Sequence, residues 1–381
     1  MGDQRHLAHR ARGETAARRV RSLGIAKPGA LDYYGYDEPE LPEGGFRVDT
    51  LFTGVSAGTE LTFVKGTNPY LCSRWDPEFG VFTPGEPTQG YPVRRLGYME
   101  VARVVASRCH AVGVGETVAM AYGHKTGHTA DPVSENFVSL PADLDPLLGI
   151  FIAQMGPICA NGLLHAGADL LGPCVVGLGD GVRGRRVLIV GGGVVGLLTG
   201  LFARFHQAAS VAVLETTGTR LRAAEDLGLQ PIDASDGTGW RRLKTRWRHG
   251  PGDRGADVVF QCRGQATALA TALRAVRPQG TVVDLAFYQG GAPELRLGEE
   301  FHHNGLSLRC AQIARVPRGL AHLWDRHRLA AETIALLRAY AAQIREHVIT
   351  DVVGFDHAPS VITEIAARRR HAIQLVLRVR S

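Results

Sequence analysis

The chain has 381 residues, of which 45% are hydrophobic and 21% charged, and this balance excludes a disordered protein and predicts two domains. Much of the net charge of +6 lies in the first twenty residues, and no basic stripe carries aromatics, so no nucleic-acid partner is expected. No apolar run approaches the roughly 20 residues that span a bilayer, the N-terminus lacks the apolar core of a secretory signal, and the cysteines are scattered, so we expect a cytoplasmic protein without a membrane partner.

The first part of the chain predicts a β domain. A flexible basic tail is expected over residues 1–20 and the domain over residues 21–154. Short apolar runs there alternate with Gly, Pro and polar turns, as in FRVDTLFTGV, LGYMEVARVVAS and ETVAMAY. This spacing predicts a mostly antiparallel β structure. The stretch LDPLLGIFIAQMGPICANGLLHAGADL has few breakers and predicts a helix at the domain border.

The second part predicts an α/β domain over residues 155–318. Four strand-like runs, RVLIV, SVAVLE, GADVVFQC and GTVVDLAFY, are separated by helical patterns of roughly 10 to 15 residues. This alternation predicts a doubly wound parallel sheet covered on both faces. Residues 319–381 contain a helical pattern and end in the strand-like HAIQLVLRVRS, which is expected to return to the first domain.

A glycine-rich turn is the strongest functional signal. In RVLIVGGGVVGLLTG, the residues Gly191, Gly193 and Gly196 have GxGxxG spacing, and Val194 and Val195 begin a helix. Such glycines permit a tight turn, a close approach of a pyrophosphate, and close packing of helix and strand, while the helix N-terminus attracts the phosphates. The five residues therefore predict a dinucleotide site. The alternative is a glycine turn in another α/β fold.

Glu215 ends the next strand, SVAVLE, about 20 residues further on. A carboxylate at this place accepts hydrogen bonds from the ribose hydroxyls of the cofactor. It also disfavours a 2′-phosphate, because two negative charges would repel each other. The sequence therefore favours NAD(H). Arg220 lies close by as a counter-charge, so NADP(H) is the alternative.

The β domain, the αβ-alternating half and the returning strand together resemble the medium-chain dehydrogenase/reductase superfamily, which includes zinc alcohol and polyol dehydrogenases. The segments that carry the resemblance are GVSAGTEL, LGYMEVARVV, GRRVLIVGGGVVGLL, GADVVFQCRG and LRAVRPQGTVV. The resemblance covers nearly the whole chain after the first twenty residues. It implies a Rossmann domain, a GroES-like catalytic domain and a homodimer.

The resemblance implies a zinc-independent member with no bound metal. Zinc-binding members carry a cysteine ahead of Gly-Thr/Ser-Asp, whereas this chain reads SAGTE with Ser56 and Ala57 there. They carry Gly-His-Glu, whereas this chain reads GYME with Tyr98, and the span 122–140 lacks the cysteines of a structural zinc lobe. A bound zinc needs three protein ligands. The alternative is a metal site rebuilt from other residues: Cys159, His165, His124 and His128.

Without a metal, proton donors must meet the charge that builds up on a substrate oxygen. By resemblance, Thr59 matches the hydroxyl that passes the substrate proton to the nicotinamide ribose, although Thr62 stands where many members extend this relay with a histidine. Tyr98 is expected to donate to the substrate oxygen, and the alternative is that it only fills the vacated metal space. Glu60 and Glu100 are expected to pair with arginine or to orient substrate hydroxyls, with surface placement as the alternative.

The segment AYGHKTGHT contributes His124 and Lys125, which by position in the family pattern border the cleft. A lysine whose pKa is lowered by desolvation is able to act as an acid. The alternative is a solvated turn with polar tips. The expected catalytic residues are therefore Thr59, Tyr98, Glu60, His124 and Lys125.

These features predict an NAD(P)(H)-dependent oxidoreductase that interconverts an alcohol and a ketone on a small polyhydroxylated substrate, namely a sugar, cyclitol or aminocyclitol, in secondary metabolism. Polar donors outnumber aromatics in the candidate loops, which favours such a substrate, and a mainly apolar lining would count against it. Two alternatives stay open. One is a reductase of a conjugated C=C bond or a quinone, and the other is a non-catalytic dinucleotide-binding protein.

Overall fold

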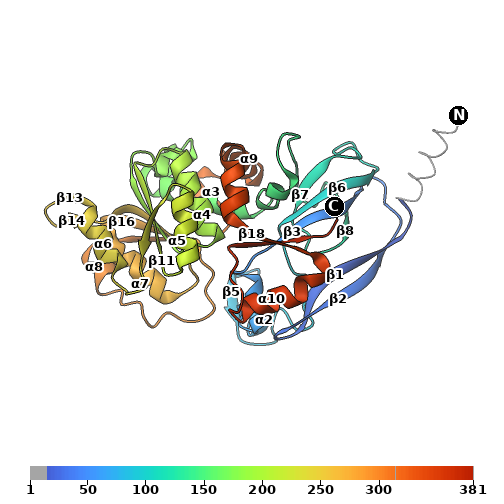
Figure 1. Cartoon of the computed structure of the whole chain (residues 1–381), viewed down its shortest axis with the longest axis horizontal. Coiled ribbons are helices and arrows are strands. Elements are labelled where there is room, and N and C mark those ends of the chain that lie inside the picture. The colour runs from blue at the N-terminus through green and yellow to red at the C-terminus, as the bar shows by residue number, and fades with distance from the viewer. Residues whose placement is uncertain (1–14, 314, 381) are drawn as a thin grey trace. The chain divides into compact units, whose positions relative to one another are not determined.

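The computed structural model describes residues 15–313 and 315–380. They fall into two units, and Figure 1 labels many of their helices and strands. The first unit comprises the described residues up to Ala153 together with those from Asp351, and the second unit comprises Gln154–Thr350. The first unit therefore contains both ends of the described chain.

The first unit is built on a seven-stranded sheet in the order β18-β19-β3-β6-β7-β9, with β8 paired to β3. Two further pairs, β1 with β2 and β4 with β5, form antiparallel hairpins. Its strands are β1 (Arg18–Lys27), β2 (Ala30–Glu38), β3 (Phe46–Val55), β4 (Arg74–Asp76), β5 (Val81–Thr83), β6 (Glu100–Ser107), β7 (Thr117–Met120), β8 (Gly127–Ala130), β9 (Phe137–Ser139) and β19 (Gln374–Arg378), with β18 (Ile349–Gly354) crossing the border between the units. Its helices include α2 (Glu60–Lys65) and α10 (Ala358–Ala366).

The C-terminal end of β3 is held in an apolar cluster. Val55 pairs with Leu375 of the antiparallel strand β19, and both side chains are buried. Leu61 of α2 and Ile362 of α10 belong to the same cluster. Burial of such side chains contributes about 1.5 to 3 kcal/mol each. This packing fixes the segment that follows β3, which begins with Ser56.

The second unit contains a six-stranded sheet in the order β12-β11-β10-β15-β16-β17, and each neighbouring pair is parallel. This order is the one found in dinucleotide-binding folds, where the ligand lies at the carboxyl ends of the strands where the order reverses. Its strands are β10 (Arg186–Val190), β11 (Ser210–Glu215), β12 (Gln230–Asp233), β13 (Arg248–Gly250), β14 (Asp253–Arg254), β15 (Ala256–Gln261), β16 (Val276–Asp284) and β17 (Ser307–Cys310). Its helices include α3 (Met155–Leu171), α4 (Val194–Phe205), α5 (Gly218–Asp226), α6 (Gly239–Arg246), α7 (Ala266–Ala275), α8 (Glu300–His303) and α9 (Arg326–Gln343).

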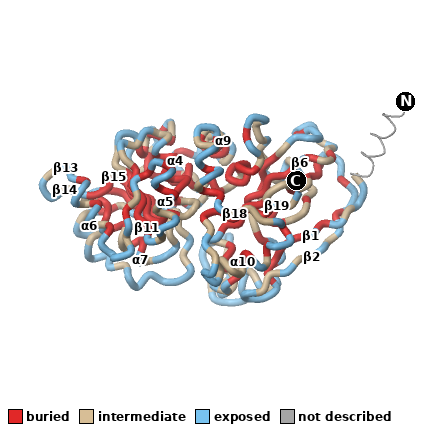
Figure 2. The backbone as a smooth tube through the Cα atoms, viewed as in Figure 1, coloured by how far each residue is buried: buried red, intermediate tan, exposed pale blue. Residues whose placement is uncertain are grey.

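The central strands of the parallel sheet are buried along their length, as Figure 2 shows for β11 and β15. Strands covered by helices on both faces need apolar side chains at successive positions, which RVLIV supplies in β10. On one side α3 packs against α4 and α9, and elsewhere α6 packs against α7. The continuous apolar runs recognised in the sequence are therefore the core strands of this unit.

The fold class predicted from the sequence, a doubly wound parallel sheet with a mostly antiparallel β domain, is confirmed. The structure differs in where the chain returns to the first unit, which is at Asp351 rather than residue 319. The reason is that α9 packs on α3 within the second unit. Of the expected tail over residues 1–20, residues 1–14 lie outside the described residues, and Arg18–Val20 already belong to β1.

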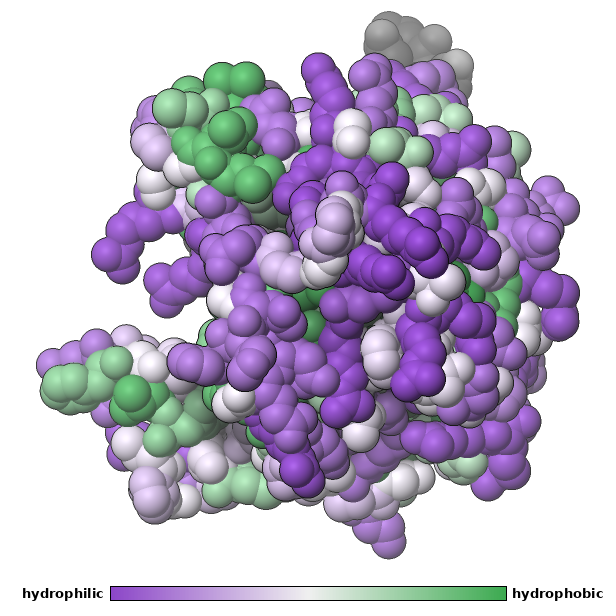
Figure 3. All heavy atoms as spheres, turned by 90° about the vertical axis from the view of Figure 1, so that its left-hand side faces the viewer, coloured by the Kyte–Doolittle hydropathy of each residue, from purple (hydrophilic) through white to green (hydrophobic). Residues whose placement is uncertain are grey.

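The sequence predicts no membrane partner. Among the helices of the described residues, none has both the length and the apolar character that a membrane crossing requires. Figure 3 shows one face of the molecule, on which hydrophilic side chains predominate and hydrophobic areas are scattered.

Candidate cofactor and substrate sites

The glycine turn of the second unit lies between β10 and α4. Gly191 has a φ of 102°, a conformation that favours glycine. A Cβ added to Gly196 would lie 1.9 Å from the carbonyl oxygen of Gly191, so helix and turn approach too closely for any side chain. No atom of the described residues lies within 4 Å of a Cβ added to Gly193. The backbone before Val194 is therefore open to a ligand, and the N–H groups of the α4 N-terminus suit a phosphate.

Glu215 faces this turn from the end of β11. Its carboxylate accepts hydrogen bonds from the backbone N–H of Gly192 at 2.8 Å and of Thr216 at 2.7 Å. Burial alone would raise the pKa of Glu215, but these backbone bonds and the charges of Arg220 and Arg263 lower it below its ordinary value. The side chain is therefore a buried carboxylate held ionised beside the turn.

A pocket with a volume of about 630 Å³, open to solvent, lies beside Glu215. Leu214, Ala234 and Ala268 give it apolar walls, while Glu215 and Arg263 are polar groups on its lining. This combination fits a flat apolar base attached to a ribose. The residues present thus fit the adenosine part of a dinucleotide, with the diphosphate at the glycine turn.

In the first unit, the segments that follow β3 and precede β6 meet. Tyr98 donates a hydrogen bond from its hydroxyl to Oγ of Ser56. The meeting follows from the sheet, because Thr53 of β3, which precedes Ser56, pairs with Glu100 of β6, which follows Tyr98. Burial and the nearby carboxylate of Glu60 raise the pKa of Tyr98 to about 12, although hydrogen bonds with Ser56 and Thr59 lower it in part. The phenol therefore keeps its proton at neutral pH.

A buried charged cluster adjoins Tyr98. His124 Nε2 lies 2.8 Å from a carboxylate oxygen of Glu60, and His124 Nδ1 lies 2.6 Å from the hydroxyl of Thr53. Thr53 in turn donates to Glu100 at 2.9 Å. Because the single hydroxyl proton of Thr53 goes to Glu100, His124 is the donor at both of its nitrogens. This agrees with the pKa of His124, which burial lowers but the two carboxylates raise above its ordinary value.

Four of the five expected catalytic residues share this region. Glu60 and His124 are paired directly, and both Glu60 and Thr59 act on the pKa of Tyr98. Lys125 is placed elsewhere, with Nζ 5.4 Å from the centre of the Tyr36 ring. Burial and the charge of Arg95 lower the pKa of Lys125. No contact of Lys125 with Tyr98 is found among the described residues.

Glu60 and Glu100 pair with a buried histidine, whereas the sequence led us to expect arginine partners or a surface position. The structure also adds residues that sequence reasoning did not select. Thr53 joins the cluster, and Arg263 lies 3.8 Å from Glu215. The position of Arg263 directly after the β15 run was the available signal, since ligand contacts gather at carboxyl ends of parallel strands.

The residues considered for a rebuilt metal site each have another partner. Among the described residues, no group of three or more His, Cys, Asp or Glu side chains is arranged to hold a metal ion. The partners are Glu60 for His124, Glu135 for His128, the carbonyl of Arg315 for His165, and the carbonyl of Val195 for Cys159. At Ser56, Ala57 and Tyr98 the donor types do not fit zinc, which prefers thiolate, imidazole or carboxylate.

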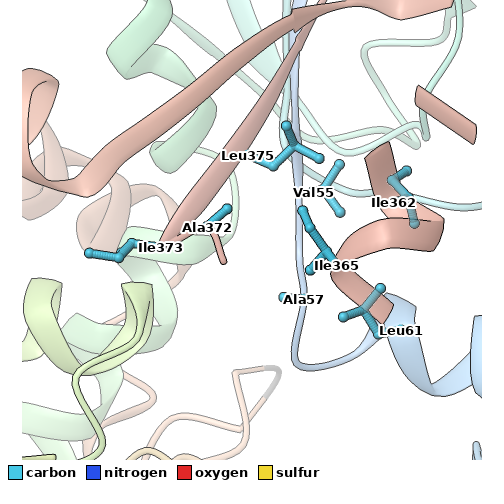
Figure 4. Close-up of a pocket in the computed structure, with 8 residues that line it drawn as sticks. All are labelled: Val55, Ala57, Leu61, Ile362, Ile365, Ala372, Ile373 and Leu375. Atoms are coloured by element: carbon cyan, nitrogen blue, oxygen red, sulfur yellow. The ribbon is translucent and has the colours of Figure 1, made fainter. Parts of the chain in front are cut away.

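A second pocket lies in the first unit beside Ala57. Figure 4 shows that side chains from β3, α2, α10 and the region of β19 surround it. All of its lining residues are apolar: Val55, Ala57, Leu61, Ile362, Ile365, Ala372, Ile373 and Leu375. Its volume is about 10 Å³, roughly the room that one water molecule needs, so it is a packing gap rather than a substrate site.

Comparisons with known proteins agree with this geometry. Residues 194–319 match the family model described as zinc-binding dehydrogenase. The chain is 25% identical over 354 residues to D-guloside 3-dehydrogenase of Escherichia coli strain K12, which covers 89% of this chain and 94% of that protein. The chain belongs to the medium-chain dehydrogenase/reductase superfamily. The membership predicted from the sequence is thus confirmed, and so is the prediction of an NAD(P)-dependent dehydrogenase/reductase.

Solved structures show the same fold for this dehydrogenase/reductase. A dehydrogenase of Sinorhizobium meliloti 1021 bound to NADP has a TM-score of 0.70 at 22% identity, covering 95% of this chain and 99% of that chain. An alcohol dehydrogenase of E. coli CFT073 complexed with NADH has a TM-score of 0.67 at 15% identity, covering 94% and 99%. The family model does not reach Ser56, Ala57 or Tyr98, so its name says nothing about a metal at these positions.

Proposed function

We propose that this dehydrogenase/reductase interconverts an alcohol and a ketone on a small polyhydroxylated molecule, with NAD(H) as the hydride carrier and without zinc. The observation that carries the proposal is the protonated Tyr98, hydrogen-bonded to Ser56 where zinc-binding members have metal ligands. The similarity to D-guloside 3-dehydrogenase over most of both chains supports a sugar or a related polyol as substrate.

Each group of the chain has a separate task in this proposal. The glycine turn and Glu215 would hold a nicotinamide dinucleotide, which would supply the chemistry of hydride transfer. Tyr98 holds a proton at its hydroxyl and donates it to the substrate oxygen as negative charge develops there. Ser56 orients the phenol, and Thr59 exchanges the proton with it. Glu60 and His124 hold the segment that carries Ser56 and Thr59, since Glu60 accepts the backbone N–H of Ser56 at 2.9 Å.

Glu215 supports NAD(H) over NADP(H). A 2′-phosphate at the adenosine ribose would meet a buried ionised carboxylate, and repulsion in a partly desolvated site is costly. Arg220 lies 3.6 Å and Arg263 3.8 Å from Glu215, so part of this repulsion would be offset. Equilibrium binding of NADH and NADPH to the purified protein tests the preference directly.

A reductase of a conjugated C=C bond or a quinone is the second candidate, because such a reaction needs no strong polarising group. The apolar gap beside Ala57 does not support it, since a volume of about 10 Å³ is too small for such a substrate. The proposal of a polyol substrate rests on the hydroxyl groups of Tyr98 and Ser56 and on the similarity to D-guloside 3-dehydrogenase. A non-catalytic dinucleotide-binding protein is the third candidate.

One experiment separates the three candidates. Purified protein is assayed with NAD⁺ and NADP⁺ on a panel of sugars, glycosides and cyclitols, and with NADH and NADPH on enones and quinones. Oxidation of a polyol supports the proposal, and reduction of enones alone overturns it. Cofactor binding without any turnover favours the non-catalytic protein. Zinc analysis of the same sample tests whether the protein binds a metal. The cytoplasmic location of the protein, its homodimeric state and its role in secondary metabolism stay predictions.

A further inference from the structure

A polar network lies at the carboxyl edge of the parallel sheet, on the side of the glycine turn opposite Glu215. In the sheet, β10 stands between β11 and β15, and Val190 of β10 pairs with Leu214 on one side and with Gln261 on the other. Gln261 in turn pairs with Asp284 at the end of β16. A dinucleotide with its adenosine beside Glu215 and its diphosphate at the turn therefore extends toward the ends of β15 and β16.

Three side chains form this network. The Tyr288 hydroxyl donates to Asp284 Oδ2 at 2.7 Å, and Gln261 Nε2 donates to the Tyr288 oxygen at 3.0 Å. Gln261 also accepts the backbone N–H of Arg263 at 3.1 Å, and Asp284 accepts that of Ala286 at 2.9 Å. The network thus ties the loop after β15 to the loop after β16.

The backbones of these loops are in close contact. A Cβ added to Gly264 would lie 2.3 Å from the carbonyl oxygen of Phe287. A Cβ added to Gly191 would lie 3.0 Å from Cβ of Arg263. The loop after β15 therefore contacts both the glycine turn and the loop after β16. A displacement of the loop after β16 would displace the loop after β15, which borders the expected path of the cofactor across the sheet.

Gln261 is fully buried, Asp284 is 8% exposed and Tyr288 is half-buried, so two of the three members are shielded from solvent. Buried polar groups that are fully hydrogen-bonded make their surroundings rigid, whereas removal of one partner leaves the others unsatisfied. A rigid loop is needed here because the flat carboxamide of a nicotinamide is best fixed by backbone donors and acceptors that do not move.

We propose that Tyr288, with Asp284 and Gln261, positions the loop that receives the nicotinamide end of the cofactor. These are positioning residues that act through the backbone of the loop after β16. The inference rests on the proposed function only in taking the cofactor to be a nicotinamide dinucleotide. It assigns no substrate, so it stands whether a polyol or an enone is turned over.

The test compares two ligands that differ at one end. ADP-ribose contains the adenosine, diphosphate and second ribose but no nicotinamide, whereas NADH contains all four parts. Binding of both is measured by calorimetry for the wild type and for Tyr288→Phe, which removes the hydroxyl and keeps the ring. We expect the Kd of NADH to rise about tenfold, equal to about 1.4 kcal/mol, while the Kd of ADP-ribose changes less than about twofold.

Tyr340→Phe is the matched control, because Tyr340 lies in the same unit on α9 and contacts the Phe205 ring instead of this network. Its Kd values for both ligands are expected to equal those of the wild type. If Tyr288→Phe lowers thermal stability severely, Asp284→Asn replaces it, since the amide keeps the shape of the carboxyl group and removes its charge.

The outcomes decide the inference. If Tyr288→Phe raises the Kd of NADH but not that of ADP-ribose, the inference is supported. If both Kd values stay unchanged or rise equally, the inference is wrong. Binding of NADH without oxidation of any polyol would reject the proposed reaction but leave this inference standing. A wild type that binds neither ligand overturns both.

Discussion

Tyr98 and Ser56 are joined by a hydrogen bond in which the phenol is the donor. The pair occupies a region where zinc-binding relatives carry ligands, and the pKa of Tyr98 is raised to about 12 by burial and by Glu60. A metal ion would stabilise charge on the substrate oxygen, and here a neutral hydroxyl group would have to do so. This substitution is the chemical core of the proposed reaction.

Tyr98→Phe removes the proposed donor and keeps the ring that fills the space. We expect kcat to fall about 100-fold or more, because a positioned acid contributes roughly 10² to 10⁴ in rate. The Kd of NADH should stay unchanged, since Tyr98 is not part of the nucleotide pocket. Steady-state kinetics and a binding titration check both numbers. Ser56→Ala, which removes only the orienting acceptor, should have a smaller effect, and an unaltered kcat in Tyr98→Phe would remove Tyr98 from the mechanism.

Glu215→Gln removes the buried negative charge and leaves one acceptor oxygen where the carboxylate has two, one for the N–H of Gly192 and one for the N–H of Thr216. NADH should bind about tenfold more weakly, because the ribose loses charged hydrogen bonds. NADPH should bind relatively better, because Arg220 and Arg263 then lack the carboxylate beside them. The ratio of the two Kd values is the measurement. A ratio equal to that of the wild type would contradict the role given to Glu215.

Two glycines of the same turn should respond differently to alanine. Gly196→Ala places a methyl group 1.9 Å from the carbonyl oxygen of Gly191, so the helix must move and the melting temperature should fall by several degrees. Gly193→Ala meets no described atom within 4 Å and should leave the melting temperature nearly unchanged. It should still weaken NADH binding, because its methyl group points at the expected diphosphate. Calorimetric melting and NADH titration of both variants test this difference. If the two variants had the same melting temperature and the same Kd for NADH, the prediction would be wrong.

The His124 cluster predicts a pH dependence of stability. Burial lowers the pKa of His124, but Glu60 and Glu100 raise it above the unfolded value of about 6.5. The folded state therefore binds this proton more tightly than the unfolded state does. The resulting stabilisation is fully present below the unfolded pKa and is lost as the pH rises through the folded pKa.

His124→Asn removes this titration. The difference in free energy of unfolding between wild type and variant should be largest near pH 6 and shrink as the pH rises. Denaturant unfolding at several pH values measures it. His128→Asn is the control, because His128 pairs with the half-buried Glu135 outside the cluster. A difference for His124→Asn that does not depend on pH would show that the imidazole is neutral in the folded protein.

The second unit could be predicted from sequence because its signals are local. Runs such as RVLIV and the glycine turn determine strand, turn and helix without knowledge of distant residues. The border at residue 319 was predicted too early because the packing of α9 on α3 depends on residues far apart in the chain. Likewise, the network of Asp284 and Tyr288 arises only once two parallel strands end side by side.

The candidate site of the first unit could be predicted only in part. Tyr98 and Thr59 follow from positions in a family pattern, but the direction of Lys125 does not. Lys125 forms an isolated bridge with Ser22, and neighbours in extended backbone point to opposite sides, so His124 enters the cluster while Lys125 turns to Tyr36. The pairing of His124 with Glu60 joins residues on separate segments, and no local spacing indicates it.

The strand β19 has a consequence for how the protein is made. It lies between β18 and β3, and Leu375 pairs with Val55, so the sheet of the first unit is incomplete until the ribosome has synthesised this late strand. The second unit, in contrast, is one uninterrupted stretch from Gln154 to Thr350. Domains generally fold as units during synthesis. We therefore expect the nascent chain to fold its nucleotide-binding unit first, while the unit that carries Tyr98 stays partly folded until β19 has been translated.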